Sequence, residues 1–520
     1  MTSTTSPAVL RWSDIRRDWR AHVTDWRNVT AGSVVVNREK HGYDFQQLGI
    51  IPPSLLDTVD GRGIPKGHFI GRVVRANRCR TDDELLSHHG NPGPKFVAGH
   101  EFGVEVIDTG EGSTLRVGQL GAGRVRSLCG CKFCGCGQTH FCQGPFDASN
   151  GASVERGIAV KAHDPMLGFG GFRELVCYPD SALSLDVDGL CRAQDLALGE
   201  PASIGINCLM LAHTEGAQIP YWAQTDDLGR DPVVVVLGLG PCAAVTGIEA
   251  LCWEDLFTFD FRAAQAERLS GLWDDVEAEL GNIGVDRAAL DRIQNRWEST
   301  LLRLDPVTRV RGTAGWFPQQ PFSRPGQFKV VFISKSSFDT SNPDKWDPRW
   351  RSLKEIGGDR FHYVSVDDLA VNDTGYDFTK LVNTHPAFAG RSPCMVIDFC
   401  TSARFATNAF RSRHLGGFGG ADTVCVGTSI AGPETVEAGD CGTQYKWDVL
   451  RSGRKVFAVN FPYVALDYAV RMLGQVNSRR RGFWDNFVQQ SFSTPQAFAE
   501  GAIEAHAQPG VFRIALDPNG

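Results

Sequence analysis

The feature that most constrains the fold is the run VVVVLGLGPCAAVTGIEAL at residues 233–251. Strands that are buried on both faces of a sheet are continuous apolar runs, and the four valines and the leucine fit that pattern. Glycines then allow a tight turn, and helix-period apolar sequence follows. The run is too interrupted to cross a membrane, because two glycines and a proline cut it and Glu249 carries a charge. A strand, a turn and a helix in this order predict a parallel α/β sheet.

The turn in this run has the residues of a dinucleotide-binding fingerprint. Gly238, Gly240 and Pro241 precede Ala243, at a position where the fingerprint accepts glycine or alanine. Backbone N–H groups at the start of the following helix suit a pyrophosphate.

The next strand, which decides how the ribose is held, has two candidates. DLFTFD ends at Asp260, whose carboxylate would hold the ribose hydroxyls of NAD, although Asp260 could equally cap a helix that begins near Ala263. KVVFISKSS would instead place Ser334 and Lys335 at the ribose and would suit NADP. We favour Asp260, because its distance from Gly238 requires no insertion inside the first βαβ unit.

The rest of the chain can be divided by its pattern of apolar, charged and proline residues. Residues 31–201 carry short alternating runs that predict an irregular β domain. Residues 262–304 have charged, amphipathic helix-period sequence, followed by a proline-rich loop, so we predict a helical insertion at 262–326. The fold class is therefore α/β plus β, with a catalytic domain at 1–205, to which 476–520 returns, and a nucleotide-binding domain at 206–475.

Five cysteines in fourteen residues predict a metal site. Cys129, Cys131, Cys134, Cys136 and Cys142 stand in a glycine-rich segment, where tight turns let thiolates surround one ion. Four thiolates at tetrahedral corners are typical of structural zinc. The spacing leaves open whether Cys129 or Cys136 completes the set.

A second, more dispersed set could form a catalytic metal site. A catalytic zinc needs three protein ligands and one open position. Cys79 and His100 supply a thiolate and an imidazole, and a third ligand must come from elsewhere. Asp82 could orient His100 by bonding its other ring nitrogen.

The order of these motifs resembles that of the medium-chain zinc alcohol dehydrogenases. The motifs are AxxCRTDD, GHE, the cysteine-rich lobe, GGFxELVxYP at 170–179, an EP pair at 200–201 and GLGPxxA. The resemblance covers residues 71–260 well and 394–469 loosely. It implies a GroES-like catalytic domain joined to a Rossmann domain, with one catalytic and one structural zinc and a nicotinamide cofactor.

The resemblance also implies roles for single residues. Cys79 and His100 look like catalytic-zinc ligands, and Glu200 falls where the family has its third ligand. In that position polyol and threonine dehydrogenases have glutamate. Glu101 would be an alternate ligand or a neighbour that contacts a ligand.

Three further residues acquire roles from the same resemblance. Thr81 is similar to the hydroxyl that passes on the substrate proton, and Arg80 to a residue that contacts the cofactor phosphate. Glu84 stands where liver-type enzymes have the histidine that ends the proton relay, so it is a candidate for that task.

Composition limits the partners. The net charge of -7 and the pI near 6.0 give no basic surplus for nucleic acid or an anionic membrane. The first residues lack a secretory signal pattern, so we expect a cytoplasmic enzyme acting on a small alcohol or carbonyl compound, as a homodimer or homotetramer. The alternatives are a redox-neutral epimerase or lyase on the same fold and a non-catalytic scaffold.

Overall fold

A computed structural model of the 520-residue chain describes parts of both predicted domains. The structure describes residues 9–37, 39–79, 82, 86, 96–124, 170–212, 233–238, 240–252, 280, 286–292, 328–334, 348–372, 375–388, 393, 395–399, 405, 409, 424–427, 455–457, 463–508, 511 and 513–519. Of the predicted insertion at 262–326, only residues 280 and 286–292 are therefore described, so its role stays a prediction.

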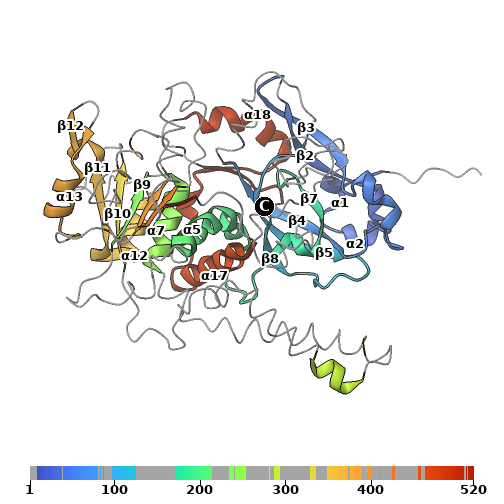
Figure 1. Cartoon of the computed structure of the whole chain (residues 1–520). Coiled ribbons are helices and arrows are strands. Elements are labelled where there is room, and N and C mark those ends of the chain that lie inside the picture. The colour runs from blue at the N-terminus through green and yellow to red at the C-terminus, as the bar shows by residue number, and fades with distance from the viewer. Residues whose placement is uncertain are drawn as a thin grey trace, which may run out of the picture.

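Among the described residues, a parallel sheet of six strands forms the half of the fold that contains the glycine turn (Figure 1). The strands in spatial order are β11 (Phe361–Ser365), β10 (Lys329–Ser334), β9 (Val233–Leu237), β14 (Met395–Asp398), β15 (Val424–Gly427) and β16 (Lys455–Phe457). Numbered along the chain, this order is 3-2-1-4-5-6, which is the Rossmann arrangement. The predicted fold class is confirmed in this half.

One prediction about this sheet is wrong. The strand beside β9 on one side is β10, with Val330 opposite Val234, and on the other side it is β14, with Val396 opposite Val235. Both neighbouring positions are thus occupied, so DLFTFD is not the second nucleotide-binding strand. The alternative, KVVFISKSS, holds that position. Asp260 itself lies outside the described residues.

Helices cover both faces of this sheet because alternate residues of each strand point to opposite faces. Val234 and Val236 of β9 pack in one core cluster with the helices α5 (Gly199–Ala212), α7 (Pro241–Leu251), α12 (Pro348–Gly357) and α17 (Tyr463–Arg479). Val233 and Val235 face a second cluster that includes α13 (Phe378–Thr384).

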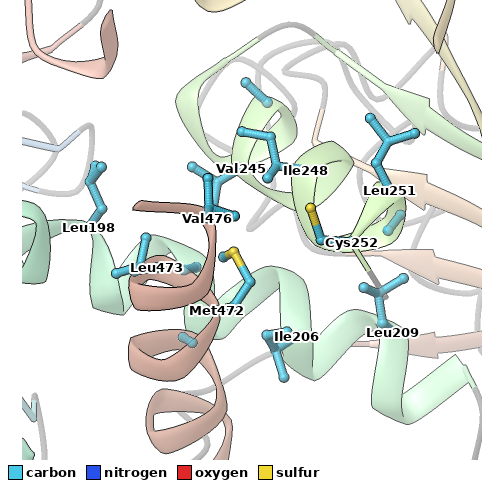
Figure 2. Close-up of a cluster of buried hydrophobic side chains, with 14 of the residues drawn as sticks. Leu198, Ile206, Leu209, Val245, Ile248, Leu251, Cys252, Met472, Leu473 and Val476 are labelled. Carbon is cyan, nitrogen blue, oxygen red and sulfur yellow. The ribbon is translucent and has the colours of Figure 1, made fainter. Parts of the chain in front are cut away.

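The contact between α5, α7 and α17 is a continuous apolar core (Figure 2). Ile206 and Leu209 of α5 pack with Ile248 of α7 and Met472 of α17. The predicted domain boundaries, 205 and 475, fall inside α5 and α17, so these two helices link the domains rather than belonging to one. The boundaries themselves stay predictions.

The catalytic half is built on a seven-stranded sheet. Its strands are, in spatial order, β17 (Gln490–Phe492), β18 (Ile514–Leu516), β4 (His68–Asn77), β5 (Glu101–Thr109), β6 (Leu120–Gly123) and β8 (Leu183–Leu185), while β7 (Leu175–Pro179) also pairs with β4. The C-terminal strand β18 pairs with the end of β4, with Ala515 opposite Asn77. A segment near residue 515 therefore lies next to the residues just before Cys79.

An N-terminal layer packs against this sheet. Its strands are β1 (Leu10–Arg11), β2 (Val29–Asn37) and β3 (Gly42–Gly49). A hairpin of β12 (Ala370–Asn372) and β13 (Gly375–Tyr376) lies in the other half of the fold, near α13 (Figure 1). Trp12, Trp19 and Trp26 pack together, and the indole N–H of Trp12 donates to Asn519 Oδ1 at 3.0 Å. Asn519 Nδ2 in turn donates to the carbonyl oxygens of Val73 and Glu174.

Short helices complete the fold. They are α1 (Trp12–Ile15), α2 (Trp19–His22), η1 (Trp26–Asn28), η2 (Pro53–Thr58), η4 (Asp180–Ala182), η5 (Ala193–Leu198), η8 (Gly358–Arg360), η9 (Val366–Asp368), η10 (Phe483–Phe487) and α18 (Pro495–His506), where η marks a 3-10 helix. Within the described part of the chain, no helix combines the length and apolar character needed to cross a membrane.

Candidate metal and dinucleotide site

Three different elements bring the predicted catalytic ligands together. Cys79 follows β4, His100 immediately precedes β5, and Glu200 lies in the first turn of α5. Gly99 makes the approach to His100 possible: its φ is +90°, and a Cβ there would lie 2.6 Å from the Phe172 ring. Only glycine fits that position without strain, which gives the GHE sequence a physical reason.

Cys79 and His100 are in direct contact, and Asp82 lies beside both of them. Cys79 Sγ lies 3.0 Å from His100 Nε2. The backbone N–H of Cys79 donates to Asp82 Oδ2 at 2.9 Å, while Asp82 Oδ1 lies 3.6 Å from His100 Nδ1. A carboxylate on the far ring nitrogen fixes which nitrogen faces a metal. Asp82 thus lies where it can orient His100.

Burial and mutual charge set the protonation of this pair. Burial raises the pKa of the Cys79 thiol, although His100 opposes the shift. Burial alone would lower the pKa of His100, but the charges of Cys79 and Asp82 outweigh it and raise the pKa well above its ordinary value. The imidazole and the thiol therefore stabilise each other's charged forms.

The two glutamates beside His100 have different surroundings. Glu101 is buried and accepts hydrogen bonds from Arg513, with Nη1 to Oε2 at 2.5 Å and Nη2 to Oε1 at 3.3 Å. Glu200 is also buried, and burial raises its pKa to about 7. Because both oxygens of Glu101 are engaged by a guanidinium, Glu200 is the better placed carboxylate for a metal. Arg513 was not predicted, since nothing in its local sequence, VFRIAL, marks it.

The donor set fits zinc. Ligand atoms of Cys79, Asp82 and His100 lie within 4.8 Å of one another, and so do those of His100, Glu101 and Glu200. The two groups share His100. Tetrahedral zinc with ordinary Zn–S and Zn–N bonds separates sulfur and nitrogen by about 3.5 Å, close to the 3.0 Å between Cys79 and His100. A thiolate, an imidazole and a carboxylate are the types of ligand found in zinc enzymes.

The glycine turn lies at the carboxyl end of β9, as a dinucleotide site requires. Gly238 has a φ of +107°, and its N–H donates to the Ile333 carbonyl at 2.9 Å. Gly240 caps α7, Pro241 is its first residue, and Ala243 is fully buried. Positive φ at Gly238 favours glycine, and the helix start leaves N–H groups free for a phosphate.

The turn and the metal cluster lie close to each other. Cys242, in the first turn of α7, is half-buried and interacts electrostatically with Arg513, Glu101, Glu200 and Cys79. Burial raises the pKa of its thiol, so Cys242 is neutral. The start of α7 therefore faces the same buried region as the candidate metal ligands.

Several predicted residues lie outside the described part of the chain, and their roles stay predictions. They are Arg80, Thr81, Glu84, Asp260 and the cysteines Cys129, Cys131, Cys134, Cys136 and Cys142.

Comparison with known proteins supports the same fold. Residues 66–185 match the family model of the alcohol dehydrogenase GroES-like domain, a stretch that contains Cys79 and His100. No curated protein matches the chain in sequence.

Solved structures of low sequence identity share the architecture of the whole chain. An alcohol dehydrogenase from Thermotoga maritima is 14% identical, with 94% of this chain and 99% of that chain covered and a TM-score of 0.54. The Haloferax mediterranei glucose dehydrogenase in complex with NADP, zinc and gluconolactone is 14% identical, with 93% and 98% covered and a TM-score of 0.52. At this identity the likeness concerns the fold.

Proposed function

We propose that the chain is a zinc-dependent oxidoreductase of small alcohols in the medium-chain dehydrogenase/reductase superfamily, because residues 66–185 match the alcohol dehydrogenase GroES-like domain. The reaction would transfer a hydride from the carbon that bears the hydroxyl to a nicotinamide cofactor, release a proton and leave a carbonyl compound. The observation that carries the proposal is the pair of ligand groups that share His100 beside the glycine turn: Cys79, Asp82 and His100, and His100, Glu101 and Glu200.

Cys79, His100 and Glu200 would hold the catalytic zinc. When bound, zinc lowers the pKa of a coordinated hydroxyl, so that an alkoxide is accessible near neutral pH. Asp82 fixes the orientation of His100 through the far ring nitrogen. Arg513 donates a hydrogen bond to each carboxylate oxygen of Glu101, so we assign Glu101 to the surroundings of the metal.

The predicted proton path and the second zinc remain part of the proposal. Thr81 would take the proton from the substrate hydroxyl, and Glu84 would pass it to solvent. Arg80 would contact the cofactor phosphate. The cysteine-rich segment at 129–142 would hold a structural zinc, as its spacing indicates.

For the cofactor we propose NADP. The second nucleotide-binding strand, β10, ends at Ser334 and is followed by Lys335, so no carboxylate ends that strand. A carboxylate at this point binds the ribose hydroxyls of NAD and repels a 2′-phosphate, whereas serine and lysine suit the phosphate. Because β10 and not DLFTFD lies beside β9, we favour NADP over NAD.

The metal site is tested by exchanging Cys79. We expect Cys79→Ala to abolish alcohol oxidation and to lower the zinc content by one ion per chain, while dinucleotide binding persists. Cys177→Ala is the matched control, because Cys177 is a buried cysteine on β7, in the core formed with the N-terminal layer. Equal zinc loss in both variants, or unchanged zinc in Cys79→Ala, would contradict the proposed site.

The third ligand and the cofactor are tested separately. Glu200→Ala should remove the same zinc, whereas Glu101→Gln should retain it; the reverse result would make Glu101 the ligand. Fluorescence titration with NADPH and with NADH should show tighter binding of NADPH. Binding of neither would exclude the redox reaction.

A further inference from the structure

Arg78 is a buried arginine directly before the proposed ligand Cys79, and the proposed function gives it no task. Its side chain is 4% exposed. Its backbone N–H donates to the carbonyl of Ile514, in β18, at 2.9 Å. The chain at this point is therefore joined to the C-terminal segment as well as to β4.

The guanidinium of Arg78 bonds to two further elements. Its Nε donates to the hydroxyl of Tyr43, in β3, at 3.3 Å, and its Cζ lies 6.0 Å from the centre of that ring. Its Nη1 donates to Nδ1 of His506, the last residue of α18, in a close contact. Arg78 thus connects β3, α18 and β18 at the residue that precedes the thiol.

The chemistry of the contact assigns its donor and its acceptor. Arginine has only donors and stays charged, so Nδ1 of His506 is the acceptor in this contact. If a buried guanidinium loses a hydrogen-bond acceptor, the unsatisfied charged donor lowers the stability of the folded protein. Arg78 is consequently held where these acceptors are, and it cannot move without loss of these bonds.

We propose that Arg78 and His506 form a positioning pair that fixes the main chain at Cys79, so that its sulfur meets His100. This inference rests on the proposed zinc site. Arg78 is joined to Cys79 by the main chain, and its backbone N–H donates to the carbonyl of Ile514, so we assign Arg78 a mechanical role, exerted through the backbone. Through this pair, the end of α18 sets the affinity of the catalytic site for its metal.

A small displacement is enough for this effect. Metal sites require their ligands within about 0.5 Å of the productive geometry, and loss of supporting contacts lowers metal affinity by about 10- to 100-fold. Cys79 follows β4 and His100 precedes β5. The distance of 3.0 Å between Cys79 Sγ and His100 Nε2 therefore depends on the main chain at both residues. His100 is held by Asp82 and by the close packing of Gly99, and Cys79 by Asp82 and by its link to Arg78.

The experiment compares His506→Leu with His506→Gln in the full-length protein. Leucine removes the acceptor, whereas the glutamine side-chain carbonyl can accept from Arg78. The readout is cobalt affinity by chelator competition, followed by the thiolate-to-cobalt absorption band. Cys79→Ser supplies the background, because it removes the contribution of this site and leaves that of the cysteine-rich segment. We expect His506→Leu to weaken cobalt binding at least about 10-fold and His506→Gln to restore most of the loss.

Two further variants keep the result interpretable. Arg78→Lys keeps the charge but loses the forked geometry of the guanidinium, so we expect an intermediate loss of cobalt affinity. This variant tests the pair even if His506→Leu does not fold. Arg75→Met breaks the ion pair between Arg75 Nε and Asp517 Oδ1, 2.6 Å apart, which joins the same strand to the same C-terminal segment. We expect Arg75→Met to leave cobalt affinity unchanged.

The outcomes separate the inference from the proposed function. Unchanged affinity in both His506→Leu and Arg78→Lys, or an equal loss in Arg75→Met, would overturn the positioning role while leaving the zinc site intact. If the wild-type protein and Cys79→Ser bind the same amount of cobalt with the same band, the proposed zinc site itself fails.

Discussion

Glu249 lies in the middle of α7 and is fully buried, and both of its carboxylate oxygens lack a hydrogen-bond partner among the described residues. It faces α5: a Cβ at Gly205 would lie 1.9 Å from Glu249 Oε2. Burial raises its pKa well above the ordinary value of 4.5. The carboxyl group is therefore protonated in the folded protein at a pH at which the unfolded chain is already ionised.

This difference makes stability depend on pH. Above pH 4.5 the unfolded chain releases the proton and the folded protein keeps it, so the free energy of unfolding falls as pH rises. The loss is about 1.4 kcal/mol for each pH unit until the folded pKa is reached. Glu249→Gln removes the titrating group and keeps the shape, so the variant should gain about 1.4 kcal/mol over wild type between pH 5.5 and 6.5.

Equilibrium unfolding in urea at several pH values measures this gain. Every other titrating group is common to both proteins and cancels in the difference between them. Glu504→Gln is the matched control, because it makes the same exchange at an exposed residue of α18. A Glu249→Gln difference that stays flat over this range, or falls, would refute the assignment of a buried neutral carboxyl.

Three further outcomes are expected from single exchanges. Ser334→Asp, at the end of the second nucleotide-binding strand, should shift the preference from NADPH toward NADH by about 10-fold or more, as measured by fluorescence titration; equal affinities before and after would contradict the assigned strand. Glu101→Gln leaves the charge of Arg513 without a buried counter-charge and should cost about 3–5 kcal/mol in urea unfolding, and a loss near zero would show that the pair adds nothing. Asn519→Ala removes the acceptor of the Trp12 indole and two donor bonds, so thermal unfolding should show a loss of about 1–3 kcal/mol, with Trp12→Phe as a partial equivalent.

The strand, turn and helix around Gly238 could be predicted because a single stretch of sequence determines them. The run around Gly238 carries the apolar period, the glycines and the helix start in one window, and its strand, turn and helix are confirmed. The identity of the second strand was missed because it was inferred from distance along the chain. A crossover connection can contain any number of residues, and here 77 residues separate α7 from β10 (252–328).

The candidate site also contains contacts that could be predicted from the sequence and contacts that could not. Cys79 and His100 are twenty-one residues apart and carry recognisable neighbours, so their pairing could be predicted. Arg513 meets Glu101 across 412 residues, and His506 meets Arg78 across 428. Such contacts depend on how complete sheets and helices dock, which the sequence around each residue does not record. The burial of Glu249 belongs to the same class, since a glutamate in a helix is ordinarily exposed.

The pairing of β18 with β4 has a consequence for the order of events during synthesis. The strand next to Cys79 comes from residues 514–516, and the cation beside Glu101 is residue 513. Domains generally fold as they emerge, from the N-terminus onward. Here the seven-stranded sheet lacks β18 until the residues of the parallel sheet have been translated. Glu101 likewise lacks its ion-pair partner Arg513 until then. The proposed zinc ligands are thus translated early, whereas the contacts that residues 513–516 make beside them form only after the C-terminal segment has been made.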